Sequence, residues 1–181
     1  MKIALVSDTH VPASLPQLPD RLLEKLAGAD AILHAGDLVT LDVLEVLGKI
    51  APTTAVVGNM DPPEVTRRLN AQETLKLGRW TIGLKHGHQQ RSLQSRYIGL
   101  PYDASEFDLF YQAMATQLPD AEIIVFGHFH VPVVKQWNDR LFINPGAVAP
   151  THGRSSFAVL ELGESIVPRI IEMDEQARDL V

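Results

Sequence analysis

The sequence predicts an α/β fold, because short buried strands alternate with amphipathic helices along the first third of the chain. Apolar runs at residues 2–6, 31–33 and 54–57 are separated by two stretches in which leucines recur at helical spacing. Each of these strands is followed by polar residues, and two of them have glycine beside the polar residue. Strands that alternate with helices in this way form a parallel sheet covered by helices.

The first half of the chain supplies the elements of that sheet. Prolines make residues 12–19 a loop, Gly28 ends the first helix, and Thr40 can cap the second. The predicted elements are, in order, a strand at 2–6, a helix at 20–27, a strand at 31–33, a helix from Thr40 to Leu47 and a strand at 54–57.

The second half of the chain predicts an antiparallel arrangement. Two hairpins are indicated, one turning at Gly78-Arg79 and one at residues 138–140. The predicted elements are strands at 73–77, 80–85, 122–126, 133–137, 141–143, 157–160 and 166–171, with a helix at 104–117. Residues 89–103 form the longest loop, and loops of this length are often functional.

Composition narrows the class of protein. The 181 residues are 45% hydrophobic and 21% charged, which predicts a single globular domain over residues 1–181. Cysteine is absent, so disulfides, thiolate metal sites and a cysteine nucleophile are excluded, and a reducing cytosol suits the chain. No apolar run approaches a membrane span or a signal peptide, so we expect a cytoplasmic protein. A net charge of −6 argues against non-specific nucleic-acid binding.

Polar residues gather directly after five of the predicted strands. Four of the five groups have a glycine beside the polar residue, and glycine allows a sharp turn and a close approach of backbone. The groups are Ser7-Asp8-Thr9-His10, Gly36-Asp37, Gly58-Asn59-Met60-Asp61, His86-Gly87-His88 and Gly127-His128-Phe129-His130. Ligands of open α/β sheets bind at the carboxyl ends of strands, so these groups predict one shared site.

The residue types at this site indicate metal binding. Asp8 with His10, and His128 with His130, are spaced two apart, and in extended chain such side chains point to the same side. Carboxylate, imidazole and amide groups without thiolate suit Mn, Fe, Co, Ni or Zn. Any one group alone is more simply a turn or a helix cap, but a fivefold repeat is not expected of independent turns. Seven candidate ligands suit two ions with one bridging carboxylate: Asp8, His10, Asp37, Asn59, His86, His128 and His130.

These five groups, in this order, resemble the five motif blocks of the calcineurin-like metallophosphoesterases. Within that superfamily the chain is most similar to the small prokaryotic phosphodiesterases that are related to the retromer scaffold subunit, and the sequence Ile-Asn-Pro-Gly at residues 143–146 fits this subgroup. The resemblance spans roughly residues 1–171. It implies a four-layer α/β/β/α sandwich, in which two mixed sheets are flanked by helices.

The resemblance also implies a division of the ligands between two ions. One ion would take Asp8, His10 and His130, the other would take Asn59, His86 and His128, and Asp37 would bridge them. We expect manganese first, with nickel, cobalt, iron or zinc as alternatives. Two such ions lower the pKa of a shared water, so that hydroxide can attack the phosphorus of a small phosphate diester.

Three further residues bear on catalysis. Many members of the wider family have histidine where this chain has Met60, and methionine cannot protonate a leaving group. Asp61 is expected to orient a histidine or help a proton move, and His88 to handle a proton or contact phosphate.

Two other functions are compatible with the same fold. A protein-binding scaffold could afford to lose ligands, and none of the seven is missing. A nuclease would need a basic groove, whereas the loop supplies only Arg91 and Arg96, with Tyr97 beside them, as a clamp for one substrate group or as a solvated loop. The sequence identifies no substrate, and self-association into a homo-oligomer is expected only by analogy with small members of the family.

Overall fold

The computed structural model describes residues 1–173 and contains two five-stranded sheets. Sheet A has the strand order β10-β9-β1-β2-β3, and sheet B has the order β4-β5-β6-β8-β7. The strands are β1 (Lys2–Val6), β2 (Ala31–His34), β3 (Thr53–Ala55), β4 (Gln72–Leu77), β5 (Trp80–Lys85), β6 (Ile123–Val125), β7 (Val133–Trp137), β8 (Arg140–Asn144), β9 (Ser156–Leu162) and β10 (Ile166–Glu172).

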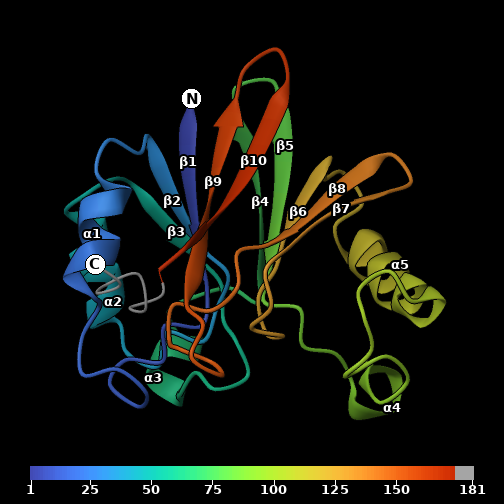
Figure 1. Cartoon of the computed structure of the whole chain (residues 1–181), viewed down its shortest axis with the longest axis horizontal. Coiled ribbons are helices and arrows are strands. Elements are labelled where there is room, and N and C mark those ends of the chain that lie inside the picture. The colour runs from blue at the N-terminus through green and yellow to red at the C-terminus, as the bar shows by residue number, and fades with distance from the viewer. Residues whose placement is uncertain (174–181) are drawn as a thin grey trace, which may run out of the picture.

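Helices cover the outer faces of the two sheets, so that the fold has four layers (Figure 1). Helices α1 and α2 lie against sheet A, and α5 lies against sheet B (Figure 1). The helices are α1 (Asp20–Leu26), α2 (Asp42–Gly48), α3 (Pro63–Thr66), α4 (Arg91–Gln94), the 3₁₀ turn η1 (Ser105–Phe107) and α5 (Asp108–Gln117). No helix within residues 1–173 has the length and apolar character needed to cross a membrane.

The alternation of side chains along β1 buries both faces of sheet A at its centre. Ile3 and Leu5 point into the core between the sheets, where they meet β5 and β6 residues such as Leu84 and Val125. Ala4 and Val6 point the other way, into the core beneath α1 and α2. A strand buried on both faces needs a continuous apolar run, and KIALV is such a run.

The expected four-layer sandwich of mixed sheets is confirmed, but the strand pairing of the second half differs from the prediction. Strands β5, β6 and β8 pair in parallel, and only β4 with β5 and β7 with β8 are antiparallel within sheet B. The hairpins were visible in the sequence because their turns are local. The parallel pairings join strands that are far apart in the chain, so no local turn sequence indicates them.

Most predicted elements are present with small shifts at their ends. Helix α2 begins at Asp42 rather than Thr40, although the Thr40 hydroxyl accepts a 3.4 Å hydrogen bond from the Asp42 N–H. The predicted loop at 89–103 contains the short helix α4. The predicted helix at 104–117 starts with the 3₁₀ turn η1 before it continues as α5, whose Phe110, Tyr111 and Met114 are buried.

Candidate metal centre

The five polar groups predicted from the sequence lie together at one end of both sheets. The loops after β1, β2 and β3 leave sheet A there, and the loops after β5 and β6 leave sheet B (Figure 1). Backbone hydrogen bonds tie neighbouring loops to each other. The Asp8 N–H donates to the Gly36 carbonyl at 3.0 Å, and the Gly127 N–H donates to the His86 carbonyl at 2.9 Å. The shared site therefore rests on the parallel pairing of strands in both sheets.

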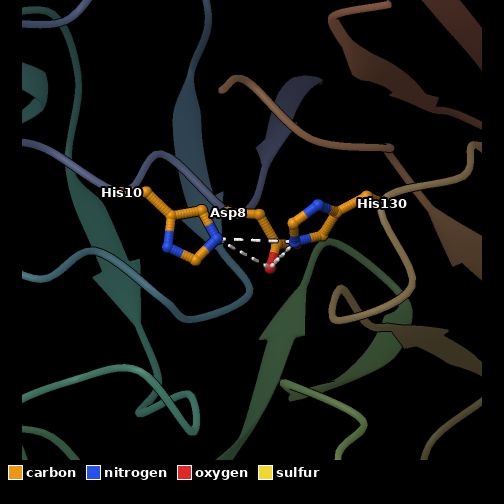
Figure 2. A group of neighbouring side chains, drawn as sticks. All are labelled: Asp8, His10 and His130. Carbon is orange, nitrogen blue, oxygen red and sulfur yellow. Dashed lines mark hydrogen bonds and ion pairs between the residues drawn. The ribbon is translucent and has the colours of Figure 1, made fainter. Parts of the chain in front are cut away.

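Asp8, His10 and His130 form the first cluster (Figure 2). The Asp8 Oδ1 atom lies 3.1 Å from His130 Nε2 and 3.8 Å from His10 Nε2. The two Nε2 atoms lie 3.4 Å from each other. Figure 2 shows the two imidazoles approaching the carboxylate from opposite sides, so that all three donor atoms converge on one small region. This arrangement provides one oxygen and two nitrogens for an ion.

Asp8, Asp37 and His86 form the second cluster, which shares Asp8 with the first. Asp37 Oδ2 lies 3.2 Å from His86 Nε2 and 3.9 Å from His10 Nε2. One carboxylate oxygen of Asp37 thus stands between a histidine of each cluster. The two clusters are adjacent, and their carboxylates are almost completely buried.

Hydrogen bonds to Nδ1 orient two of the histidines. His86 Nδ1 lies 2.7 Å from the Ala35 carbonyl oxygen, which can only accept, so this nitrogen carries a proton. His130 Nδ1 lies 2.8 Å from the Thr151 hydroxyl. In both rings the opposite nitrogen, Nε2, faces the carboxylates. Histidines that bind metals commonly engage their second nitrogen with an oxygen in this way.

The donor atoms fit a bound cation. His86 Nε2 faces Asn59 Oδ1 at 3.1 Å and Asp37 Oδ2 at 3.2 Å, so a neutral ring would direct its lone pair at two oxygen acceptors. Asp8 Oδ1 is buried and faces His130 Nε2 at 3.1 Å, a contact that becomes a hydrogen bond only when this nitrogen carries a proton. Both features require positive charge at the centre, either as protons on the imidazoles or as divalent ions. Carboxylate, amide and imidazole donors suit divalent transition metals.

Charge pairing shifts the pKa values in the direction that this geometry predicts. Burial raises the pKa of the Asp8 carboxyl, but the neighbouring His130 and His86 imidazoles outweigh burial and hold that pKa below its ordinary value. Burial likewise raises the pKa of Asp37, and His86 and the Met60 N–H outweigh it and hold the pKa low. Burial lowers the pKa of His86, but Asp37 and Asp8 raise it above 6.5 overall. Contact with Asp8 raises the pKa of His130 despite its partial burial.

Asn59 and His128 lie at the more open side of the site. Asn59 is exposed, and its side chain reaches the centre through His86 Nε2. His128 is half-buried and belongs to neither cluster, although its backbone N–H donates to Asp8 Oδ2 at 3.1 Å. Burial and the charge of His86 lower the pKa of His128 to about 4, so this ring is neutral at pH 7.

The backbone at five of the predicted ligands is left-handed and not extended: Asp37, with a φ of 58°, and the four residues of the two i, i+2 pairs. Asp8, His10, His128 and His130 have φ values of 54°, 46°, 71° and 58°. We expected the i, i+2 side chains to converge because the chain is extended there. That reason is wrong, because the backbone is not extended at these residues. These residues lie in tight turns after the strands, and side chains with positive φ are uncommon outside functional sites.

Two glycines make room for the carboxylates. A Cβ atom on Gly58 would overlap Asp37 Oδ1 and the Asp37 backbone. A Cβ atom on Gly127 would overlap the Ser7 hydroxyl and lie 2.7 Å from Asp8 Oδ2. The Ser7 hydroxyl donates to this same Asp8 oxygen at 2.5 Å, so Gly127 leaves space for the group that orients Asp8. Close approach to a carboxylate is the physical reason for glycine at both positions.

The Asp61 carboxylate binds backbone and holds two loops together. It accepts hydrogen bonds from the N–H groups of Val39 at 2.7 Å, Gly58 at 2.7 Å and Asp37 at 3.1 Å. These bonds place Asp37 relative to the loop that carries Asn59. None of the hydrogen bonds that Asp61 makes among the described residues goes to a histidine, so the expected role in orienting one stays a prediction.

His88 and Met60 lie beside the clusters. His88 is half-buried, its ring centroid lies 5.5 Å from that of His86, and its Nδ1 is buried without a hydrogen-bond partner among residues 1–173. Burial and the charges of His86 and Lys85 lower the pKa of His88. The Met60 side chain is exposed, while its backbone N–H donates to Asp37 Oδ1 at 2.7 Å.

Sequence reasoning missed several residues that support the site. The Ser7 and Thr151 hydroxyls bind Asp8 and His130, and the Gln94 side chain lies 2.8 Å from His128 Nε2. Tyr97, expected as a substrate clamp or an exposed loop residue, is fully buried against Phe107, so both expectations are wrong for it. Arg91 and Arg96 are exposed as a solvated loop would have them. No motif marks Gln94 or Thr151, because both act through contacts distant in sequence.

Comparison with known proteins assigns the family. The family model described as "Calcineurin-like phosphoesterase superfamily domain" matches residues 1–165 of this chain. A probable metallophosphoesterase of Methanothermobacter thermautotrophicus is 29% identical over 176 residues, which cover 94% of this chain and 92% of that protein.

Solved structures show the same fold. An archaeal phosphodiesterase has a TM-score of 0.72 at 22% identity, covering 96% of this chain and 100% of that chain. Vps29 of Entamoeba histolytica, in complex with Zn²⁺, has a TM-score of 0.71 at 24% identity, covering 95% and 99%. From its family match and its relatives, this chain belongs to the calcineurin-like phosphoesterase superfamily and is a metallophosphoesterase.

Proposed function

We propose that this protein is a phosphodiesterase that hydrolyses small phosphate diesters with two divalent metal ions. The observation that carries the proposal is the pair of adjacent clusters around Asp8, in which one buried carboxylate oxygen faces Nε2 of His10, His86 and His130 within 4.0 Å.

The proposed ligands divide between the two ions as follows. Asp8, His10 and His130 would hold one ion, Asn59, His86 and His128 would hold the other, and Asp37 would be shared between them. The position of Asp37 Oδ2, within 3.9 Å of His10 Nε2 and 3.2 Å of His86 Nε2, supports the bridging role. We propose manganese as the first metal to test, with nickel, cobalt, iron and zinc next, because the ligand set accepts all of them.

When bound, the two ions supply positive charge for the phosphoryl oxygens and lower the pKa of the water that attacks phosphorus. The protein holds the carboxylates in fixed places through Ser7, which binds Asp8, and through the Met60 N–H, which binds Asp37. Asp61 fixes the backbone that carries Asp37. The buried carboxylates keep the centre rigid, so little reorganisation is needed during the reaction.

His88 is proposed to contact the phosphate or to move a proton. Its Nδ1, which has no hydrogen-bond partner within residues 1–173, and its lowered pKa leave a neutral imidazole near the second cluster. Met60, which borders Asn59, can do neither, because a thioether has no proton to donate. We therefore propose that the enzyme prefers diesters with a good leaving group, such as a nitrophenol, over simple alkyl esters.

The relatives also support a second function, a protein-binding scaffold. Vps29, a vacuolar protein sorting-associated protein by name, shares the fold. The seven ligand-type residues are all present here, which favours catalysis. A nuclease is disfavoured because the exposed arginines of the 91–96 segment are not part of a longer basic stripe in the sequence.

The test is the change Asp37→Asn, which keeps the shape of the side chain but removes the charge that faces a histidine of each cluster. We expect metal-dependent hydrolysis of bis-p-nitrophenyl phosphate to fall by at least about 100-fold. Asp42→Asn, on the exposed first turn of α2, is the matched control and should leave turnover unchanged. Normal hydrolysis by Asp37→Asn would refute the two-ion mechanism.

A further inference from the structure

Gln94 makes the one side-chain contact that reaches a proposed metal ligand from the 89–103 segment, as far as the described residues show. Its amide Nε2 lies 2.8 Å from His128 Nε2. Its Oε1 accepts a 3.3 Å hydrogen bond from the Gln89 N–H, so the amide is held from both ends. The contact joins the last residue of α4 to the turn after β6.

The segment around Gln94 is anchored firmly enough to position a side chain. The Tyr97 N–H and the Ile98 N–H donate to the Gln94 carbonyl at 3.2 Å and 2.9 Å, which fixes its backbone. The Tyr97 ring is fully buried and lies 6.3 Å from the ring of Phe129, the residue that separates the two histidines. The segment therefore contacts the loop that carries His128 at two points. Gln94 contacts His128, and Tyr97 packs near Phe129.

The backbone of His128 is already fixed by its N–H bond to Asp8 Oδ2 at 3.1 Å. What remains free is the rotation of its imidazole and the nitrogen that carries the proton. The ring lies edge-on to His86, with centroids 5.3 Å apart. Because Gln94 occupies Nε2, Nδ1 is the nitrogen left to face an ion.

A glutamine amide can serve both states of this ring. As placed, its NH₂ group donates to Nε2, which puts the imidazole proton on Nδ1. A metal-binding Nδ1 must offer a lone pair, so the proton then belongs on Nε2 and the facing group must accept. A half-turn of the amide exchanges its nitrogen for its oxygen and satisfies this second state, at the expense of the hydrogen bond from the Gln89 N–H.

We propose that Gln94 is a positioning residue that selects Nδ1 of His128 as a metal-binding atom, switching its amide from donor to acceptor when the ion binds. The proposal rests on the proposed function, because it assumes that His128 holds an ion. It predicts that the 89–103 segment, which carries no ligand itself, controls how tightly one of the two ions is held.

The first readout is the imidazole tautomer of His128 in protein stripped of metal, measured by long-range ¹H–¹⁵N NMR and assigned by comparison with His128→Asn. Wild type should carry the proton on Nδ1. Gln94→Glu, which can only accept, should move the proton to Nε2. Gln90→Glu, an exposed position at the start of the same helix, adds the same charge without the contact and should leave the tautomer unchanged.

The second readout is metal binding to the stripped protein, measured by calorimetry with Mn²⁺. Gln94→Leu should weaken one of the two binding steps by about 10- to 100-fold and leave the other unchanged, as is usual when the partner of a metal-binding histidine is lost. Gln90→Leu is the matched control and should bind both ions as wild type does. A thermal melt of each variant establishes that it is folded.

The outcomes separate the two proposals. If wild type binds two ions and Gln94→Leu binds both equally well, with the His128 tautomer unchanged in Gln94→Glu, the positioning role of Gln94 is overturned while the proposed function stands. If wild type binds no ion although the tautomer responds to Gln94, the proposed function fails. The selection of a metal-binding nitrogen by Gln94 then fails with it. Selective weakening of one ion together with a tautomer change supports both.

Discussion

The two sides of the metal centre are built differently. The buried side consists of Asp8, His10, Asp37 and His86, all of which are less than 9% exposed and lie at the ends of central strands. The open side consists of Asn59, His88 and His128, which are exposed or half-buried and depend on loops. Burial fixes side chains through many neighbours, whereas the open side is fixed by single contacts such as Gln94 with His128. The difference suggests a rigid half that fixes the carboxylates and an adjustable half that adapts to substrate.

The largest expected difference between the two sides appears when one proposed ligand is removed from each. Asp8→Asn should lower turnover by about 1000-fold, or about 4 kcal/mol, because Asp8 belongs to both clusters. Asn59→Ala should lower turnover by only about 10- to 100-fold, because it removes one proposed ligand of one ion. Turnover and bound metal are measured together for both variants. Equal losses of turnover in both variants would show that the buried side contributes no more to catalysis than the open side.

The second prediction concerns space on the buried side. Gly58→Ala would place a methyl group onto Asp37, and relieving the overlap should destabilise the fold by about 3 kcal/mol. Gly48→Ala is the control, since a methyl group there meets nothing within 4 Å. Urea unfolding measures both. A wild-type stability for Gly58→Ala would mean that the loop can move away from Asp37.

The third prediction separates two roles for Asp61. If it anchors backbone, Asp61→Ala should lose about 2 kcal/mol of stability, because three N–H groups lose their acceptor. The rate of Asp61→Ala should be lower at every pH, while the shape of the pH–rate profile stays that of wild type. If instead Asp61 moves a proton, Asp61→Asn would remove one limb of the pH–rate profile without a comparable loss of stability.

The fourth prediction is a pH dependence that differs between stripped and loaded protein. In stripped protein the pKa values of His86 and His130 are raised above 6.5 by the carboxylates, so their protonated forms stabilise the fold. That contribution is complete below about pH 6.5 and is lost as the pH rises through the raised folded pKa values. Metal requires the neutral rings, so its stabilisation grows over the same range.

The stability gap between loaded and stripped protein should therefore widen between pH 6 and pH 8, by about 1 kcal/mol per pH unit for each proton displaced. Thermal melts across this range at a fixed Mn²⁺ concentration measure it. A gap that stays constant would mean that the ions do not displace protons from these histidines.

Much of the buried side could be predicted from the sequence, because its residues follow strands whose apolar runs are unmistakable. KIALV before Asp8 and WTIGLK before His86 locate two of the proposed ligands by local pattern alone. The open side could be predicted only in part. Asn59 lies in a recognisable motif, but the contact between Gln94 and His128 joins residues 34 apart and has no local signature.

The predicted reason for convergence failed where the backbone departs from regular structure. The turns at Asp8 and His130 have positive φ, which no spacing rule foresees. The antiparallel prediction for the second half failed at β5, β6 and β8 for a related reason, since parallel pairing is decided by packing between distant segments. Tyr97 was misjudged because its loop folds back onto an aromatic cluster that the sequence does not reveal.

The most direct test of the central claim is to strip the purified protein of metal, add Mn²⁺ stepwise, and follow bound metal and bis-p-nitrophenyl phosphate hydrolysis together. We predict that hydrolysis is absent in the stripped protein and reaches its maximum only when about two equivalents are bound, as a two-ion site requires. Full turnover at one equivalent, or turnover that does not depend on metal, would contradict the account.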